Sequence, residues 1–261
     1  MRVDASGPGW IVPDWRAPPR VRSAFSLRTG GVSAAPFDSL NLGAQVGDTA
    51  AAVIENRRRF RQALALPAEP LWLRQQHGTV VVDADRLEAH AAPPQADAAV
   101  TRRAGTVLAV LVADCIPVLL ARADGSAVAV AHAGWRGLGA GVLEAAVAAL
   151  RTGAAGSAPA CAWLGPSIGP ARFEVGEEVR AAFVARDAAA AGAFVANARG
   201  RWQCDLQALA RRRLDALGVG PVGGAESCTA GHPAQYFSFR RDGATGRMAA
   251  LVWLQPEAAG A

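Results

Sequence analysis

The pattern of apolar and polar residues is most regular in the centre of the chain. Residues 107–113 form a continuous apolar run, which is typical of a strand buried on both faces. Further apolar strands are expected at 118–121 and 127–131, and an amphipathic helix at 138–150. The other expected strands are 21–29, 71–75, 79–82, 162–164, 236–239 and 248–254, and the other expected helices are 49–64, 176–185 and 205–217.

The expected strands and helices alternate only loosely, and several strands are neighbours in sequence. The last two strands are expected to form a hairpin that turns at Asp242-Gly243. This pattern favours a mixed α/β sandwich over a strict doubly wound parallel sheet. We expect an irregular N-terminal arm over residues 1–19, a single catalytic domain over 20–254 and a C-terminal tail over 255–261.

The composition is that of a globular protein without a membrane span. Hydrophobic residues make up 51% of the 261 residues. No apolar run approaches the ~18 residues that a membrane-spanning helix needs. The segment Met1–Trp15 contains two prolines and two aspartates, and it lacks the apolar stretch of a secretory signal. We therefore expect a cytoplasmic protein with no membrane partner.

The charge of the chain does not indicate nucleic acid binding. The net charge is +5 and the pI is about 9.8. The arginines are dispersed, however, apart from triplets at 57–59 and 211–213, and these lie in helix-like segments without interleaved aromatic residues. Such triplets are typical of solvated helix faces. We expect no nucleic acid partner, and a monomer is the default expectation.

The chain contains no lysine, and this excludes several kinds of chemistry. All 27 basic residues are arginine. A Schiff-base lysine is therefore impossible, and pyridoxal-phosphate chemistry is excluded with it. The lysine of a P-loop and the strand lysine of a protein kinase are excluded on the same ground.

Three residues that can ligate a metal each follow or end an expected strand. His132 precedes Ala-Gly-Trp-Arg-Gly and the helix at 138–150, a junction that favours anions, and Arg136 adds a positive charge to it. Cys115 follows the apolar run, and Asp114 beside it needs a partner if it is buried. We expect that partner to be a ligating histidine. His77 lies in Arg-Gln-Gln-His-Gly-Thr after a short strand.

The alternative interpretation is that these residues serve the fold alone. His132 could be satisfied in the core, Cys115 could be a small buried side chain, and His77 could be an exposed turn residue. Together they form a His2Cys set, which holds zinc with a fourth position open for water or substrate. Their spacings of 38 and 17 residues do not form a local ligand motif, so spacing alone does not establish the site. His232 and Cys228 lie in a loop that could approach it.

Several motifs resemble one known family over roughly residues 20–254. The motifs ADC, HAGWRG and RRDGATGR together are specific to the purine nucleoside phosphorylase family formerly called multicopper polyphenol oxidases or laccase-domain proteins. The matching stretches, in the family's order, are SLRTGGVS (26–33), SLNLGAQVGD (39–48), QQHGT (75–79), ADAAVT (96–101), LAVLVADCIPVLL (108–120), VAVAHAGWRGLGAGVLEAAV (128–147), LGPSIGPARFEVGEEV (164–179) and FSFRRDGATGRMAALVWL (237–254).

This resemblance implies a fold, a metal and two activities. The implied fold is a four-layer sandwich of mixed sheets between helices. The implied metal is zinc, held by His77, Cys115 and His132. The implied activities are phosphorolysis of adenosine, inosine, guanosine and S-methyl-5′-thioadenosine, and deamination of adenosine. The older copper oxidase label is disfavoured, because three ligands and four histidines cannot build a multicopper centre.

The substrate-binding residues follow less directly. We expect Arg136 and the backbone of 134–137 to bind phosphate, with Arg28 as a second cation, and Asn41 and Gln76 to contact the base or ribose. Some family members are instead described as peptidoglycan editing factors, which hydrolyse UDP-MurNAc-L-serine. An amidase of that kind, with Cys115 as nucleophile or with the same zinc, therefore stays open as a rival function. A non-catalytic metal protein is disfavoured, since structural zinc sites usually have four protein ligands.

Overall fold

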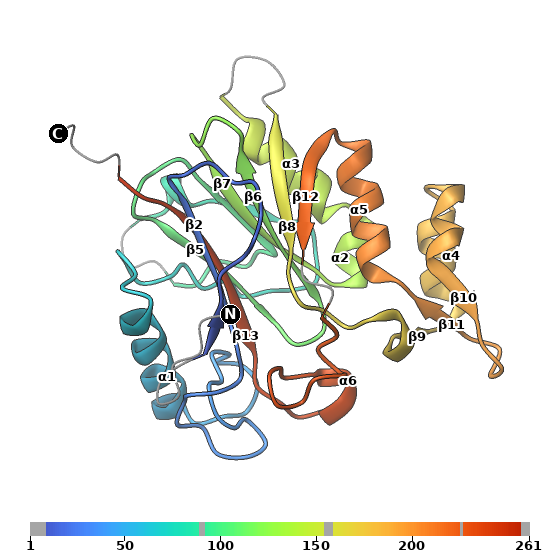
Figure 1. The fold of residues 1–261 in the computed structure, drawn as a ribbon, viewed down its shortest axis with the longest axis horizontal. Coiled ribbons are helices and arrows are strands. Elements are labelled where there is room, and N and C mark those ends of the chain that lie inside the picture. The colour runs from blue at the N-terminus through green and yellow to red at the C-terminus, as the bar shows by residue number, and fades with distance from the viewer. Residues whose placement is uncertain (1–8, 89–91, 154–158, 225–226, 257–261) are drawn as a thin grey trace.

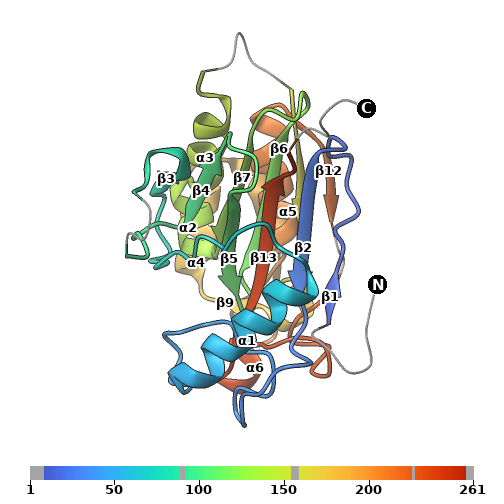
Figure 2. The same cartoon turned by 90° about the vertical axis from the view of Figure 1, so that its left-hand side faces the viewer.

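Two β-sheets packed face to face form the centre of the protein, and helices cover their outer faces (Figures 1 and 2). The computed structural model describes residues 9–88, 92–153, 159–224 and 227–256. Three clusters of buried side chains separate the four layers, one between the two sheets and one between each sheet and its helices. The expected mixed α/β sandwich is therefore confirmed.

The larger sheet has six strands in the order β12-β8-β6-β7-β4-β3. Its two edge pairs are parallel and its central pairs are antiparallel, so the sheet is mixed. Alternate residues of its central strands face the second sheet and the helices, which explains their nearly continuous burial. Its strands are β3 (Val81–Asp83), β4 (Ala98–Thr101), β6 (Ile116–Arg122), β7 (Val128–Ala133), β8 (Ala160–Leu164) and β12 (Val219–Gly224).

The second sheet has four antiparallel strands in the order β1-β2-β13-β5. They are β1 (Trp10–Ile11), β2 (Val21–Ser26), β5 (Val107–Val112) and β13 (Met248–Leu254). Helix α1 (Ala50–Ala63) covers its outer face, and the hydroxyl of Thr49 caps that helix. Because β1 pairs with β2, the expected irregular arm contains a strand from residue 10 onward. Residues 1–8 and 257–261 lie outside the described residues.

The outer face of the six-stranded sheet carries the remaining helices and a small third sheet. Helices α3 and α5 pack on the strands, and α4 lies beside the three-stranded sheet at the edge of the molecule (Figure 1). That sheet has the antiparallel order β10-β11-β9. These elements are α2 (Trp135–Ala140), α3 (Val142–Arg151), β9 (Glu174–Val175), α4 (Glu177–Val184), β10 (Phe194–Ala196), β11 (Trp202–Cys204) and α5 (Leu206–Ala216), with 3-10 turns at Ala84–Arg86, Pro170–Arg172 and Ala188–Ala193.

Two expected elements are replaced by others. The helix expected at 138–150 is two helices, because Gly141 at φ 112° takes the left-handed conformation and separates α2 from α3. The strand expected at 236–239 is absent, and α6 (Phe239–Asp242) starts there with the Ser238 hydroxyl as its cap. The expected hairpin is therefore wrong, since β13 pairs with β2 and β5 instead.

Two further expectations at the sheet edges were also wrong. The segment 71–75 forms only isolated bridges, because the side-chain amide of Gln75, not a strand backbone, pairs with the backbone of Leu111. Strand β6 begins at Ile116 and includes Pro117, so it starts before the strand expected at 118–121. Pairing of β6 with β8 starts only at Val118, so Pro117 removes no ladder hydrogen bond there. No helix among the described residues is long and apolar enough to cross a bilayer.

Candidate metal centre and active-site cleft

His77, Cys115 and His132 converge at one edge of the six-stranded sheet. Cys115 directly precedes β6, and His132 lies near the end of its antiparallel neighbour β7, because the register pairs Ile116 with Ala133. His77 comes from the loop before β3. One potential ligand atom from each side chain lies within 4.8 Å of those from the other two, and Cys115 Sγ is 3.9 Å from His77 Nε2. The structure therefore brings the three expected ligands together.

Asp97 is the carboxylate that orients this cluster, and the sequence analysis did not single it out. It directly precedes β4, beside β7, and its Oδ1 lies 2.9 Å from His132 Nδ1. Burial raises the pKa of Asp97, but hydrogen bonds from His132 and backbone amides outweigh it and lower the pKa. The ionised carboxylate can only accept, so the Nδ1 of His132 donates. Its Nε2 then remains as the ligand atom, as in carboxylate–histidine–metal arrangements.

The same carboxylate also shapes the loop that carries His77. Its oxygens accept hydrogen bonds from the backbone N–H groups of Gln76, His77 and Gly78 at 3.0, 2.9 and 2.8 Å. His77 has φ 59°, a conformation that is uncommon for residues other than glycine. The three N–H bonds to Asp97 compensate for that backbone conformation. One buried side chain thus fixes both histidines.

Gly134 leaves the space that the cluster occupies. A Cβ atom at this position would lie 2.9 Å from Cys115 Sγ and 2.9 Å from His77 Cδ2. Its φ of −69° is available to any residue, so the requirement for glycine here is steric. The glycine of HAGWRG therefore permits the close approach of two candidate ligands.

Cys115 and His132 favour opposite charges. Burial raises the pKa of the Cys115 thiol, but the adjacent His132 and His77 rings lower it to about 6. Burial lowers the pKa of His132, but the Cys115 thiolate and the Asp97 carboxylate raise it to about 9. These shifts favour a thiolate beside an imidazolium in the metal-free protein. A metal cation at the cluster would replace the second ring proton, and the thiolate form is the one that binds metals.

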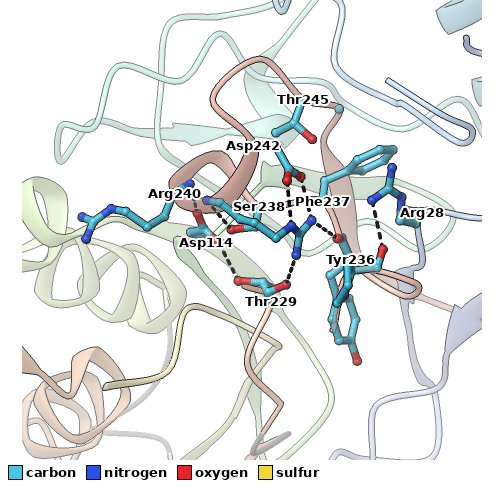
Figure 3. A network of polar contacts seen from close by, with 12 residues as sticks. Arg28, Asp114, Thr229, Tyr236, Phe237, Ser238, Arg240, Asp242 and Thr245 are labelled. Carbon is cyan, nitrogen blue, oxygen red and sulfur yellow. Dashed lines mark hydrogen bonds and ion pairs between the residues drawn. The ribbon is translucent and has the colours of Figure 1, made fainter. Parts of the chain in front are cut away.

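In the described part of the chain Asp114 forms no hydrogen bond with a histidine, which corrects the expectation for this residue. Figure 3 shows it between Thr229 and α6. Its Oδ1 accepts from the Thr229 hydroxyl at 2.6 Å, and its Oδ2 accepts from the backbone N–H of Arg240 at 2.7 Å. Asp114 has φ 95°, and its carbonyl accepts from the N–H of Ile168. This network attaches α6 to the residue before Cys115. The carboxylate that orients a histidine of the cluster is Asp97.

A cleft of about 600 Å³ opens beside the cluster. Five arginines line it, namely Arg57, Arg74, Arg136, Arg240 and Arg247. Aromatic side chains line it as well, namely Trp72, Trp135, Phe173 and Phe239. Asp114 is the only carboxylate among the described lining residues, and both of its oxygens already accept hydrogen bonds. The cleft is therefore strongly cationic and suits an anionic ligand that also has an aromatic or apolar part.

Of the four expected substrate-binding residues, only Arg136 lines this cleft. The Arg28 guanidinium donates to the carbonyls of Asp38 and Pro233 and contacts the Phe237 ring. Asn41 is fully buried and bonds to the backbone. Gln76 is exposed outside the lining of the cleft. The other four cations of the cleft were missed, namely Arg57, Arg74, Arg240 and Arg247. Two of them, Arg240 and Arg247, lie in the quoted motif RRDGATGR.

The two loop residues that could have joined the cluster lie elsewhere. His232 is exposed and packs against the Tyr236 ring, with ring centroids 6.4 Å apart. Cys228 lines a second cavity of about 490 Å³, where its sulfur accepts the Gly169 N–H at 3.1 Å. Neither residue belongs to the His77, Cys115 and His132 group.

The fold and the site together define a mixed α/β sandwich protein with one open-sided His2Cys cluster at the edge of an arginine-lined cleft. The chain belongs to the family described as multi-copper polyphenol oxidoreductase laccase, whose model matches residues 22–255. The match covers all three residues of the cluster.

Relatives of similar length carry a common name. The chain is 51% identical over 259 residues to a purine nucleoside phosphorylase of Xylella fastidiosa, an alignment that covers 95% of this chain and 98% of the relative. It is 48% identical over 245 residues to the purine nucleoside phosphorylase YfiH of Escherichia coli, covering 94% and 98%. A crystal structure of a Neisseria meningitidis DUF152 protein superposes with a TM-score of 0.88 at 44% identity, covering 95% of this chain and 99% of that one.

Proposed function

We propose that this protein is a zinc-dependent purine nucleoside phosphorylase of the cytoplasm. The proposed substrates are phosphate and adenosine, inosine, guanosine or S-methyl-5′-thioadenosine. The observation that carries the proposal is the open-sided His77, Cys115 and His132 cluster beside a cleft lined by arginines and aromatic rings. The names of relatives at about half identity support it.

The residues present fit zinc. Two imidazole nitrogens and one thiolate form a borderline-soft donor set of three, which leaves a coordination position free. Asp97 supplies the carboxylate partner that metal-binding histidines usually have. When bound, zinc would polarise a substrate oxygen and lower the pKa of bound water from ~15.7 towards ~7.

The protein's own groups would position the two substrates. In phosphorolysis a phosphate oxygen bonds to C1′ of the ribose while the bond from C1′ to the base nitrogen breaks, and the departing base takes up a proton. Arg136 at the start of α2 is a candidate for binding phosphate, since its guanidinium is exposed to the cleft. The rings of Trp135 and Phe239 offer flat faces for a purine. Holding both reactants in one cleft reduces the entropic cost of their encounter.

Deamination of adenosine to inosine is proposed as a second activity of the same cleft. It consumes water and releases ammonia, so it needs no phosphate. Phosphate dependence therefore separates the two reactions in one reaction mixture.

The test is release of hypoxanthine from inosine by the wild type and by Cys115→Ala. We expect base release only when phosphate is present, with ribose 1-phosphate in equal amount. Activity should be lost in the variant and after chelation, and zinc should restore the chelated wild type. Release of ribose and base without phosphate would show hydrolysis and contradict the proposal.

A second candidate is the amidase that hydrolyses UDP-MurNAc-L-serine. The thiolate–imidazolium pairing of Cys115 with His132 favours it, because such a pair is the activated form of a cysteine nucleophile. If neither the wild type nor Cys115→Ala releases base, but the wild type frees serine from this precursor, the amidase becomes the better account. Activity that survives chelation would then indicate the thiol as nucleophile.

A further inference from the structure

Two arginines that line the cleft are held by one short segment of backbone. The guanidinium of Arg57, on α1, donates to the Leu42 carbonyl through Nε at 3.0 Å and Nη2 at 2.8 Å. The Leu42 N–H in turn donates to the carbonyl of Arg247 at 3.1 Å. Asn41 Oδ1 accepts the N–H of Arg247 at 2.9 Å, and a Cβ on Gly43 would lie 2.8 Å from the Arg247 side chain. Both arginines therefore flank residues 41–43.

Neither guanidinium has a carboxylate partner among the described residues. Neither Arg57 nor Arg247 forms an ion pair within 4.0 Å in the part of the chain that the structure covers, and both are half-buried. The side chain of Arg247 donates only to the carbonyls of Thr245 and Gly246. Buried charges in proteins are usually paired, because an unpaired one loses hydration without compensation. Two such groups on one cleft wall indicate that an anion completes the site.

The surroundings strengthen this argument. Burial lowers the pKa of Arg57 to about 10, and Glu69 raises it by less. Burial also lowers the pKa of Arg247, and Cys115 and Asp114 raise it by less. The Glu69 carboxylate accepts from the Trp72 indole. The Trp72 ring lies under Arg57 at 4.0 Å and fixes the plane of its guanidinium. The guanidinium groups are thus held in place, and among the described residues neither has a carboxylate within 4.0 Å.

We propose that Arg57 and Arg247 form an anion subsite of the cleft that binds a phosphate group. Planar guanidinium groups with donors left over suit the tetrahedral oxygens of phosphate. The choice of phosphate as the ligand of this subsite rests on the proposed function. The subsite differs from the phosphate position expected at Arg136, which α2 carries. The phosphate is either the inorganic co-substrate or a phosphate ester carried by the nucleoside, and the experiment separates the two.

The first measurement is direct binding of inorganic phosphate and of adenosine 5′-monophosphate at constant ionic strength, by calorimetry. The variants are Arg57→Gln and Arg247→Gln. The matched control is Arg58→Gln, whose side chain pairs with Glu55 and Gln62 on the exposed side of the same helix. We expect each cleft variant to weaken binding of at least one probe by about 10-fold or more, and the control to change it by less than about 2-fold. Arg57→Lys, which keeps the charge, should retain more binding than Arg57→Gln.

The pattern of losses identifies the source of the phosphate. Loss for inorganic phosphate, with a raised KM for phosphate in base release, assigns the subsite to the co-substrate. Loss confined to the monophosphate assigns it to a phosphate ester. The proposal would be overturned if Arg57→Gln and Arg247→Gln bound both probes as well as Arg58→Gln does. It would also be overturned if the wild type bound neither probe. If the variants lose binding but wild-type protein releases no base with phosphate, the proposed function fails while the subsite stands.

Discussion

The two walls of the cleft are built in different ways. The sheet-borne wall includes Cys115 and His132, with the buried Asp97 behind them, and all three lie at the ends of neighbouring strands, so backbone register sets their positions. The loop-borne wall includes Gly43, Arg240 of α6 and Arg247, which hydrogen bonds between side chains and backbone hold in place. A register can be changed only by refolding, whereas a hydrogen-bonded loop can change residue by residue. We therefore expect substitutions in the first wall to affect metal binding and those in the second to affect stability and anion binding.

The largest expected effect is from Gly134→Ala. The added methyl group would meet Cys115 and His77 at 2.9 Å, while the backbone conformation itself accepts alanine. Zinc affinity should fall by about 100-fold or more, because two ligands must move. A competition titration with a chromophoric chelator measures this loss. Gly192→Ala is the matched control, since a Cβ there meets nothing within 4 Å, and equal zinc affinity in both variants would contradict the steric role of Gly134.

A smaller effect is expected from Asp97→Asn. The amide loses the charge that orients His132, and its NH2 group faces backbone donors, so zinc affinity should fall by about 10–100-fold. Asp85→Asn is the control, because Asp85 also accepts a hydroxyl and a backbone N–H but does not touch the cluster. If both variants bind zinc as the wild type does, Asp97 is not an orienting residue.

The same substitution has a pH signature in the metal-free protein. The pKa of Asp97 is lowered in the folded state, so its stabilising effect is present at neutral pH and is lost as the pH falls through that lowered pKa. Asp97→Asn should therefore reduce the loss of stability on acidification. Urea unfolding at a series of acidic pH values measures the difference.

The smallest expected effect is from Thr229→Val, in the loop-borne wall. Removing the hydroxyl leaves one oxygen of the buried Asp114 without its donor, which should lower the free energy of unfolding by about 1–3 kcal/mol. Zinc affinity should stay unchanged. Thr152→Val, at an exposed hydroxyl, is the control. A large loss of zinc affinity in Thr229→Val would show that the two walls are coupled and would break the distinction between them.

The same distinction explains what the sequence could predict. The strands with continuous apolar runs and the helix that Thr49 caps carry local signals, and Cys115 and His132 lie beside or within such strands. His77 follows a segment that was expected to be a strand and forms only isolated bridges. Asp97 also precedes an apolar strand, so the reasoning that a buried carboxylate needs a partner could have found it. That reasoning was applied to Asp114, whose partners Thr229 and Arg240 lie over 110 residues away in the chain.

The loop-borne wall offered no comparable signal. Asn41 was expected to contact the base or ribose of the substrate. It is buried instead, and its side chain accepts a hydrogen bond from the backbone N–H of Arg247, 206 residues further along the chain. The burial of Arg57 is likewise invisible within its Arg57–Arg59 triplet, where it differs from its neighbours only through contact with Leu42 and Trp72. Such distinctions depend on tertiary contacts, which a periodic pattern does not encode.

The register of β7 between β4 and β6 has a consequence for assembly of the protein. Val118 pairs with Ala131, and Ala98 pairs with the same residue from the other side. A slip of either partner by one residue would send Asp97 or Cys115 to the opposite face of the sheet. Convergence of the candidate ligands therefore requires that β4, β6 and β7 pair in this register. A metal ion that needs all three ligands would bind only to molecules whose central strands have paired correctly.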